Sequence, residues 1–309
     1  MARIPRYSDG VLRLGDCLEL LTRSSKTDGA FDLIYVDPPF NTGLVHAARN
    51  KAGSRALGLS AYSDVWGGLD GFLTMMQPRL RSWHAVLAEG GSLWLHLDYR
   101  AVHDTKVMAD SVFGASGFRG EVIWVPGNGA RRKSGPSVTH QTILIYARGK
   151  QLTYHADEPT AREPYADTSR TMHFRHVDAD GRRYRERAIG GKSYRYYEDQ
   201  GRRLGSVWTD CPAMLANTPL VAETSGYPTQ KPLKLLERVI LLASNPGDRV
   251  LDPMCGSGTT LVAARRLGRR WMGIDQSPVA IQTAQRRLAS TPLPNQTSQV
   301  SGRKSNSAT

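Results

Sequence analysis

Cysteine is scarce in this chain of 309 residues, and its three copies lie far apart. Cys17, Cys211 and Cys255 form no CxxC pair and no Cys/His cluster with the spacing of zinc ligands. Neither a disulfide framework nor a metal site is therefore predicted. A reducing, cytoplasmic setting is the corresponding expectation.

Long apolar runs are also missing. No segment approaches the run of about 18 apolar residues that suggests a membrane span, and residues 1–10 lack the apolar stretch of a secretion signal. Hydrophobic residues make up 40% of the chain and charged residues 22%, which is typical of a soluble globular protein. We therefore expect no association with a membrane.

Acidic residues are in deficit. The chain has 41 Lys and Arg against 28 Asp and Glu, a formal net charge of +13. Such an excess attracts polyanions, and nucleic acid is the commonest partner. A basic protein without a nucleic-acid role remains an alternative on charge alone.

Apolar patterns alternate between the strand and helix types along most of the chain. Strands are predicted at 31–36, 92–97, 121–125, 142–147, 248–252 and 271–275. Helices are predicted at 69–87, 101–113, 232–243, 259–267 and 278–288. This alternation predicts an α/β sandwich around a mainly parallel sheet.

Three stretches depart from this pattern. Residues 41–65 are rich in Gly, Ala, Ser and Asn and predict a mobile loop, and residues 291–309 have the composition of a disordered tail. Between 126 and 220, Arg and Tyr become frequent, which favours an inserted DNA-binding region for target recognition. A solvated basic hairpin is the alternative. The candidate DNA-binding residues are Arg182, Arg183, Arg185, Arg187, Lys192 and Arg195.

A glycine turn joins a strand to a helix in 248–260, DRVLDPMCGSGTT. Gly256 and Gly258 let the backbone approach a ligand, and the helix beginning at Thr259 presents free N–H groups. Asp275 ends the next strand, where an acidic side chain can bind ribose hydroxyls. The pattern predicts a nucleoside-containing cofactor, although a purely structural turn has the same local features.

Two features favour S-adenosylmethionine over a dinucleotide. After Gly258 the chain continues Thr259-Thr260-Leu261, so the turn lacks the third glycine of the GxGxxG pattern of dinucleotide-binding proteins. Asp252, just before the turn, suits the methionine ammonium of S-adenosylmethionine and would repel a pyrophosphate. An oxidoreductase is therefore disfavoured.

The tetrapeptide Asp37-Pro38-Pro39-Phe40 follows a predicted strand, at the sheet edge where ligands bind. A base amino group is a poor nucleophile because its lone pair is delocalised. Asp37 and the Pro38 carbonyl can accept its two hydrogens and orient that lone pair toward a methyl sulfonium. The prolines fix φ and remove competing N–H donors, and Phe40 can stack on an extruded base. A strand that ends in a rigid turn is the alternative.

These motifs together resemble the β group of site-specific DNA amino-methyltransferases, which act on N6 of adenine or N4 of cytosine. The resemblance covers most of 11–290 and depends on LGDCLEL at 14–20, DPPF at 37–40, GYPTQKP at 226–232 and DPMCGSGTT at 252–260. It implies a Rossmann-like S-adenosylmethionine-dependent methyltransferase sandwich. The expected sheet is mixed, mainly parallel and seven-stranded, with an inserted target-recognition region.

The resemblance also implies an organisation and a set of site residues. Residues 1–125 would form the catalytic half of the core, 126–220 the target-recognition region, 221–290 the cofactor-binding half and 291–309 the tail. Asp37, Pro38, Pro39 and Phe40 would be catalytic. The cofactor residues would be Asp16, Cys17, Gln230, Lys231, Pro232, Asp252, Pro253, Cys255, Gly256, Ser257, Gly258, Thr259 and Asp275.

The implied substrate is double-stranded DNA, which predicts association with the nucleoid. A homodimer and a cognate restriction nuclease are further partners that the resemblance suggests. Adenine N6 is the preferred target because N4-cytosine members more often carry serine at the position of Asp37. Cytosine N4 is the alternative, and a non-catalytic DNA-binding module is a remote one. Methylation of cytosine C5 is set aside because no Pro-Cys dipeptide occurs, and His96 and Asp98 are interpreted as structural.

Overall fold

The chain forms two compact units. The computed structural model describes residues 4–24, 30–40, 44–49, 56–127, 129, 133–214 and 223–294. One unit consists of the described residues up to Tyr154 and those from Val207 onward, and the other is His155–Ser206. Each unit is described separately.

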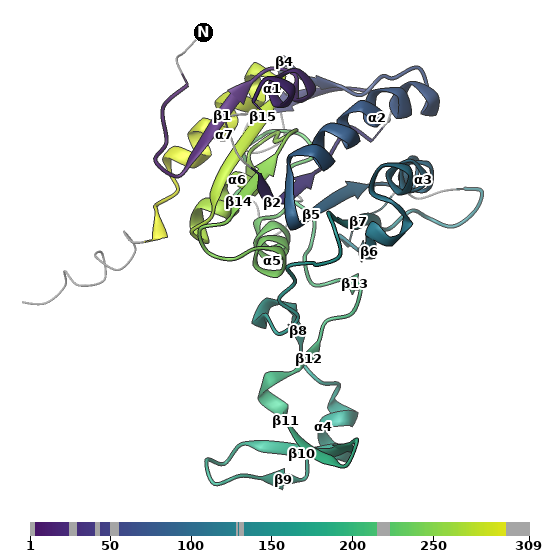
Figure 1. The fold of residues 1–309 in the computed structure, drawn as a ribbon, viewed down its shortest axis with the longest axis vertical. Coiled ribbons are helices and arrows are strands. Elements are labelled where there is room, and N and C mark those ends of the chain that lie inside the picture. The colour runs from purple at the N-terminus through teal and green to yellow at the C-terminus, as the bar shows by residue number, and fades with distance from the viewer. Residues whose placement is uncertain are drawn as a thin grey trace, which may run out of the picture. The chain divides into compact units, whose positions relative to one another are not determined.

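An eight-stranded sheet forms the centre of the first unit (Figure 1). Its strands, in spatial order, are β1 (Gly10–Leu14), β15 (Arg270–Asp275), β14 (Arg249–Asp252), β2 (Phe31–Val36), β5 (Leu87–Leu97), β7 (Gln141–Ala147), β6 (Phe118–Trp124) and β13 (Val207–Trp208). Strand β7 is antiparallel to both neighbours, and all other neighbouring pairs are parallel. The prediction of a mixed, mainly parallel sheet is confirmed.

The predicted number of seven strands was wrong. Strand β13 pairs only Val207 and Trp208 with β6, through Ile123 and Trp124. A two-residue strand is too short to show a period-2 pattern, so the sequence carries no signal for it.

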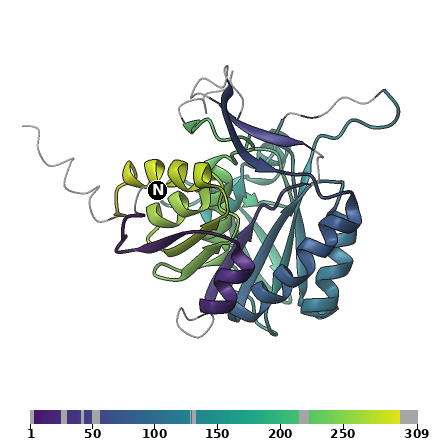
Figure 2. The same ribbon diagram turned by 90° about the horizontal axis from the view of Figure 1, so that it is seen from above.

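Helices cover both faces of this sheet (Figure 2). The helices α1 (Cys17–Ser24), α2 (Leu69–Val86) and α3 (Val102–Phe113) pack on one face, and α5 (Leu233–Ala243), α6 (Thr259–Arg266) and α7 (Pro278–Ala289) cover the other. The short 3-10 turn Ala115–Gly117 leads from α3 into β6. Among the described helices, none combines the length and the apolar character that crossing a membrane requires.

One core cluster lies between α2 and the sheet. Phe72, Met76, Leu80 and Trp83 recur along one face of α2 and are fully buried. They pack in one cluster with buried residues of β2, β5 and β15. This burial, worth about 1.5–3 kcal/mol for each large apolar side chain, fixes α2 beside the carboxyl edge of the sheet.

Three parallel strands end at one edge of the sheet. Strand β14 pairs with β2 through Val250 and Leu33, and with β15 on its other side. The side-by-side position of β2 and β14, which are far apart in the sequence, is visible in Figure 1. Asp37 follows β2, whereas Asp252 and Asp275 end β14 and β15, so all three carboxyls lie at the same edge.

The prediction of a loop at 41–65 was wrong for most of the residues that the structure describes there. Strands β3 (Val45–Arg49) and β4 (Ala56–Ser63) pair antiparallel there. Ladder hydrogen bonds join backbone groups, so a segment rich in Gly, Ala and Ser can form them without a clear side-chain pattern. Residues 41–43 and 50–55 lie outside the described residues, as does most of the predicted tail, from 295 onward.

The second unit is built around a hairpin. Its elements are the 3-10 turn Pro159–Ala161, β8 (Arg162–Glu163), α4 (Asp167–His173), β9 (His176–Val177), β10 (Arg183–Ile189), β11 (Lys192–Tyr197), the 3-10 turn Glu198–Gln200 and β12 (Arg202–Arg203). Gly190 and Gly191 connect β10 to β11 with φ of 57° and 78°, the positive values that a tight two-residue hairpin turn needs.

This unit covers fewer residues than the predicted region 126–220. Strands β7 and β13 fall within that range but belong to the central sheet. The assignment of the segments to catalysis, target recognition and cofactor binding stays a prediction.

Candidate active site

A cavity of about 510 Å³ opens at the sheet edge where β2, β14 and β15 end. Residues of both motifs line it together with residues of α1 and of the segment before α5. The predicted site residues in its wall are Cys17, Asp37, Pro38, Pro39, Phe40, Gln230, Lys231, Asp252, Pro253, Cys255, Gly256, Ser257, Thr259 and Asp275. The chain therefore brings the tetrapeptide and the glycine turn to one cavity.

Three predicted cofactor residues lie outside the wall. Asp16 forms an ion pair with Arg79, which does line the cavity. Pro232 precedes the first turn of α5. Gly258 has φ +76°, and a β-carbon on it would lie 2.8 Å from Cβ of Ala284 in α7. Glycine at 258 is thus required by helix packing.

Only one of the two carboxylate oxygens of Asp37 has a hydrogen-bond partner among the described residues. Its Oδ2 pairs with Nζ of Lys231, which is 194 residues away in the sequence. Its Oδ1 is buried and has no hydrogen-bond partner among the described residues. An unpaired buried acceptor is costly, so this oxygen is suited to a donor that arrives with a ligand.

Lys231 contacts two residues of the tetrapeptide. Its side chain is only 8% exposed, and Nζ lies 4.9 Å from the Phe40 ring centroid, within the range of a cation–π contact. Burial raises the pKa of Asp37, and the Lys231 ammonium opposes that rise. The sequence suggested a cofactor role for Lys231, but its nearest charge is the Asp37 carboxylate.

Two more carboxyls face the cavity. Asp252 is 3% exposed, and burial raises its pKa to about 7, with the nearby charges of Asp37 and Asp275 acting in the same direction. Asp275 accepts hydrogen bonds from the backbone N–H groups of Gly256 and Ser277, each at 2.8 Å. Burial also raises the pKa of Asp275.

The balance of charge in the cavity favours a cationic ligand. Lys231 compensates Asp37, and Arg79 is paired with Asp16. Asp252 and Asp275 have no basic side chain as an ion-pair partner among the described residues. A sulfonium or ammonium would stabilise the ionised form of these carboxyls, whereas a pyrophosphate would be repelled.

Aromatic side chains in the wall escaped the sequence analysis. The rings of Tyr62 and Tyr227 are stacked at 6.3 Å with an interplanar angle of 23°, and Tyr62 Oη lies 3.2 Å from Thr229 Oγ1. Trp66 donates a hydrogen bond to Asp64 at 3.0 Å. Tyr227 belongs to the GYPTQKP segment, which gives a signal for it, but Tyr62 lies in the segment predicted as a loop.

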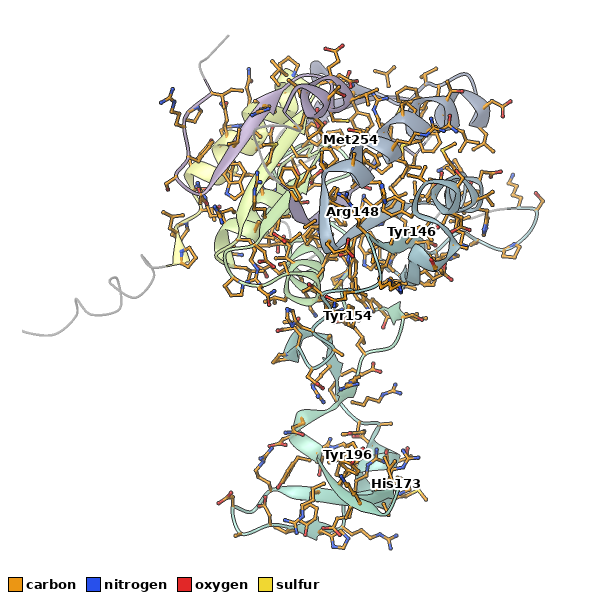
Figure 3. The ribbon with its side chains drawn as sticks, viewed as in Figure 1. Tyr146, Arg148, Tyr154, His173, Tyr196 and Met254 are labelled. Carbon is orange, nitrogen blue, oxygen red and sulfur yellow. The ribbon has the colours of Figure 1, made fainter. Side chains whose placement is uncertain are left out.

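Gly256 meets this aromatic pair. It has φ +48°, and a β-carbon on it would lie 3.2 Å from the Tyr227 ring. Any larger residue would be strained and would press on the ring. The glycine therefore allows the turn and the aromatic wall to approach each other. Figure 3 labels Met254 of the same turn, which also lines the cavity.

His96 and Asp98 are buried at the end of β5. His96 Nδ1 and Tyr35 Oη lie 2.7 Å apart, and burial lowers the pKa of His96 well below its usual value, which keeps the ring neutral. Asp98 forms an ion pair with Arg100. His96 therefore has a buried partner in Tyr35 and Asp98 an exposed one in Arg100, contacts that fit the structural interpretation of both residues.

The candidate DNA-binding residues differ in how they are paired. Arg182, Arg183 and Arg195 each form an ion pair with an acidic residue of the second unit. Arg185 lies among aromatic rings. Arg187 and Lys192 are exposed. Within the described part of the chain, no group of three His, Cys, Asp or Glu residues is arranged to hold a metal ion.

Comparison with known proteins agrees with this geometry. Residues 31–286 match the family model described as DNA methylase, which covers the N6 and N4 methyltransferases. The type II methyltransferase M2.DpnII of Streptococcus pneumoniae is 27% identical over 84% of this chain and 82% of its own length. The type II methyltransferase M.EcaI of Enterobacter cloacae is 26% identical over 83% of this chain, which spans only 64% of the length of M.EcaI.

A solved structure has the same fold. The M1.HpyAVI–SAM complex matches with a TM-score of 0.53 at 17% identity, covering 90% of this chain and 99% of that one. The chain belongs to the family of DNA amino-methyltransferases that act on N6 of adenine or N4 of cytosine. Its first unit has the fold of the S-adenosylmethionine-dependent members.

Proposed function

We propose that this protein transfers a methyl group from S-adenosylmethionine to the exocyclic amino group of a flipped base in a specific duplex DNA sequence, with adenine N6 as the target. The observation that carries the proposal is the cavity that the tetrapeptide and the glycine turn line together, where the buried Oδ1 of Asp37 has no hydrogen-bond partner among the described residues. Membership of the DNA methylase family supports the same activity.

The cavity fits the proposed methyl donor. S-adenosylmethionine, when bound, supplies a methyl group on a positively charged sulfur. Asp252 and Asp275 would hold its positive charge and its ribose, and the backbone around Gly256 would allow its close approach. M1.HpyAVI, which has the same fold, was crystallised in complex with this cofactor, and that complex supports the assignment.

The tetrapeptide would orient the base amine. Asp37 Oδ1 would accept a hydrogen bond from one amino hydrogen and the Pro38 carbonyl from the other, which directs the nitrogen lone pair out of the base plane. When the nitrogen takes the methyl group and the S–C bond breaks, one amino proton has to leave, and Asp37 Oδ1 would receive it. Lys231 holds Oδ2, so the carboxylate cannot rotate freely. Because burial raises the pKa of Asp37, Oδ1 is also a better proton acceptor than an exposed carboxylate would be. Phe40 would stack on the base.

The choice of adenine depends on Asp37. By the family resemblance, members that methylate cytosine N4 more often carry serine at this position, so an aspartate favours adenine. The same geometry can orient either amine, so cytosine N4 is the second candidate.

The test is transfer of a labelled methyl group from S-adenosylmethionine to duplex DNA, followed by digestion to nucleosides. Labelled N6-methyl-2'-deoxyadenosine is expected. Labelled N4-methyl-2'-deoxycytidine would confirm methyl transfer but identify cytosine as the target base. Binding without any transfer would leave a non-catalytic DNA-binding module. Sequencing the modified DNA would then identify the recognition site.

The proposal extends to the partners and the location of the protein. Double-stranded DNA is the partner, and binding to it would place the protein at the nucleoid. A homodimer and a cognate restriction nuclease are predicted from the family alone. Light scattering of the purified protein tests for the homodimer. The nuclease is tested by asking whether extracts of the source organism cut unmethylated DNA at the recognition site but not DNA methylated by this protein.

A further inference from the structure

The second unit, His155–Ser206, is rich in arginine but almost neutral. It contains eleven Lys and Arg and nine Asp and Glu, in a chain whose net charge is +13. The large number of arginines in this unit therefore does not show which of them contact DNA. The pairing of each cation decides which of them can bind an external anion.

The strand register divides the β10–β11 hairpin into two faces. Residues directly opposite each other share a face, and successive residues alternate. One face carries Tyr184 opposite Tyr197 and Glu186 opposite Arg195, and we call it the paired face. The other carries, toward the turn, Arg187 opposite Tyr194 and Ile189 opposite Lys192, and we call these four residues the open face.

Cations on the paired face are already neutralised. Arg195 binds Glu186 at 3.0 Å and lies over the Tyr184 ring. Arg182, just before β10, makes two hydrogen bonds of 2.8 and 2.9 Å to Asp199 and lies 4.0 Å from the centroid of Tyr197. A phosphate would have to compete with a carboxylate for either guanidinium.

Arg185 stabilises the unit itself. Its guanidinium lies 5.3 Å from the ring centroids of Tyr165 and Phe174 and 5.5 Å from that of Tyr196, which Figure 3 labels. Phe174 is fully buried. Arg185 was predicted to bind DNA, but these contacts direct it into the small core.

The open face carries exposed cations that are not ion-paired within the described part of the chain. Arg187 and Lys192 are exposed and have no acidic partner among the described residues. Tyr194 is 46% exposed and Ile189 is 49% exposed between them. Two uncompensated cations beside an exposed tyrosine form a surface that can bind phosphates and donate a hydroxyl hydrogen bond.

We propose that the open face of the hairpin, formed by Arg187, Ile189, Lys192 and Tyr194, is the surface of this unit that binds the DNA duplex. The inference rests on the proposed function, which supplies DNA as the substrate. A two-stranded ribbon is narrow enough to enter the major groove. Arg187 and Lys192 bind backbone phosphates and Tyr194 lies between them, whereas the paired face is directed away from the DNA.

Two double variants with equal loss of charge test this assignment. Arg187→Gln with Lys192→Gln changes the open face, and Arg182→Gln with Arg195→Gln changes the paired face. The dissociation constant for a fluorescent duplex is measured by anisotropy over a series of salt concentrations. The open-face variant should lower the slope of log K against log salt by about 0.9 for each of the two phosphates lost. The paired-face variant should keep the wild-type slope.

A charge-preserving variant and a folding control complete the design. Arg187→Lys with Lys192→Arg should retain the wild-type slope, and thermal unfolding shows whether each variant remains folded. Equal slopes in the wild type and the open-face variant would overturn the proposal, and so would an equal decrease in both double variants. If the wild type methylates DNA in either case, only the surface assignment fails. A wild type that transfers no methyl group would instead overturn the proposed function.

Discussion

Replacing Lys231 by methionine should change the pH dependence of methyl transfer. The substitution keeps a long apolar stem but removes the ammonium that pairs with Asp37 Oδ2. Burial already raises the pKa of Asp37, and Lys231 is the group that opposes this rise. Without it, the carboxyl should be protonated over a wider pH range and become a poorer acceptor for the base amine.

The burial of the pair sets the expected magnitude. Lys231 is 8% exposed and Asp37 is 20% exposed. A cation beside a carboxyl lowers the pKa of that carboxyl by about 1–3 units, so removing Lys231 should raise the pKa of Asp37 by roughly two units. Below the wild-type pKa of Asp37, its ionised fraction, and with it the rate, should then fall by roughly 100-fold.

The assay is single-turnover methyl transfer at a series of pH values with saturating S-adenosylmethionine. Because the ionised form of Asp37 is active, a raised pKa extends the loss of activity to higher pH. The rate of Lys231→Met should therefore increase up to tenfold per pH unit and approach the wild-type rate at high pH. Lys231→Arg, which keeps the charge, should retain most of the wild-type profile.

A parallel profile would refute this reasoning. If Lys231→Met lowers the rate by the same factor at every pH, Lys231 does not act through ionisation of Asp37. A weaker affinity for S-adenosylmethionine with an unchanged rate at saturation would instead assign Lys231 to cofactor binding, as the sequence alone suggested. Calorimetry of cofactor binding separates these two outcomes.

Three further predictions concern the cavity and the base. The affinity for S-adenosylmethionine should fall by up to tenfold per pH unit below about pH 7, because protonation of Asp252 removes a charge that attracts the ligand. Calorimetry should show that Asp252→Asn lacks this pH dependence, and a wild-type affinity that stays constant with pH would contradict the prediction. Gly256→Val should abolish cofactor affinity but leave the circular dichroism spectrum intact, since the new side chain would press on Tyr227; unchanged affinity would place the cofactor elsewhere. Base extrusion costs a few kcal/mol, so a mismatch opposite the target should tighten binding and 2-aminopurine at the target should brighten. Phe40→Ala should weaken binding of the flipped base by roughly 1–3 kcal/mol. Base flipping would be contradicted if 2-aminopurine stays dark with the wild type and with Phe40→Ala, and if matched and mismatched sites bind equally well.

Local sequence patterns predicted the edge of the sheet well. A strand followed by Asp37-Pro38 must end there, because proline cannot continue a central ladder. Asp252 and Asp275 likewise end apolar strands. Once the strands are parallel neighbours, their carboxyl ends meet, so the three carboxyls converge. Their roles in catalysis and cofactor binding remain predictions.

Contacts between distant segments were not predictable. The pair of Lys231 with Asp37 spans 194 residues, and no local period encodes it. The stacking of Tyr62 on Tyr227 depends on strand β4, which forms in a segment with loop-like composition. In the hairpin, Arg195 is paired with Glu186 on one face, whereas Arg187 lies on the other face. The sequence alone shows both only as basic residues, because the strand register and the ion pairs cannot be read from it.

The central claim is tested most directly by comparing the wild type with Asp37→Ala in two assays on the same preparations. Calorimetry measures binding of S-adenosylmethionine, and transfer of its labelled methyl group to duplex DNA measures catalysis. The account predicts that the wild type labels a base amino group, and that Asp37→Ala still binds the cofactor but transfers essentially no methyl group. Turnover by Asp37→Ala close to that of the wild type would contradict it.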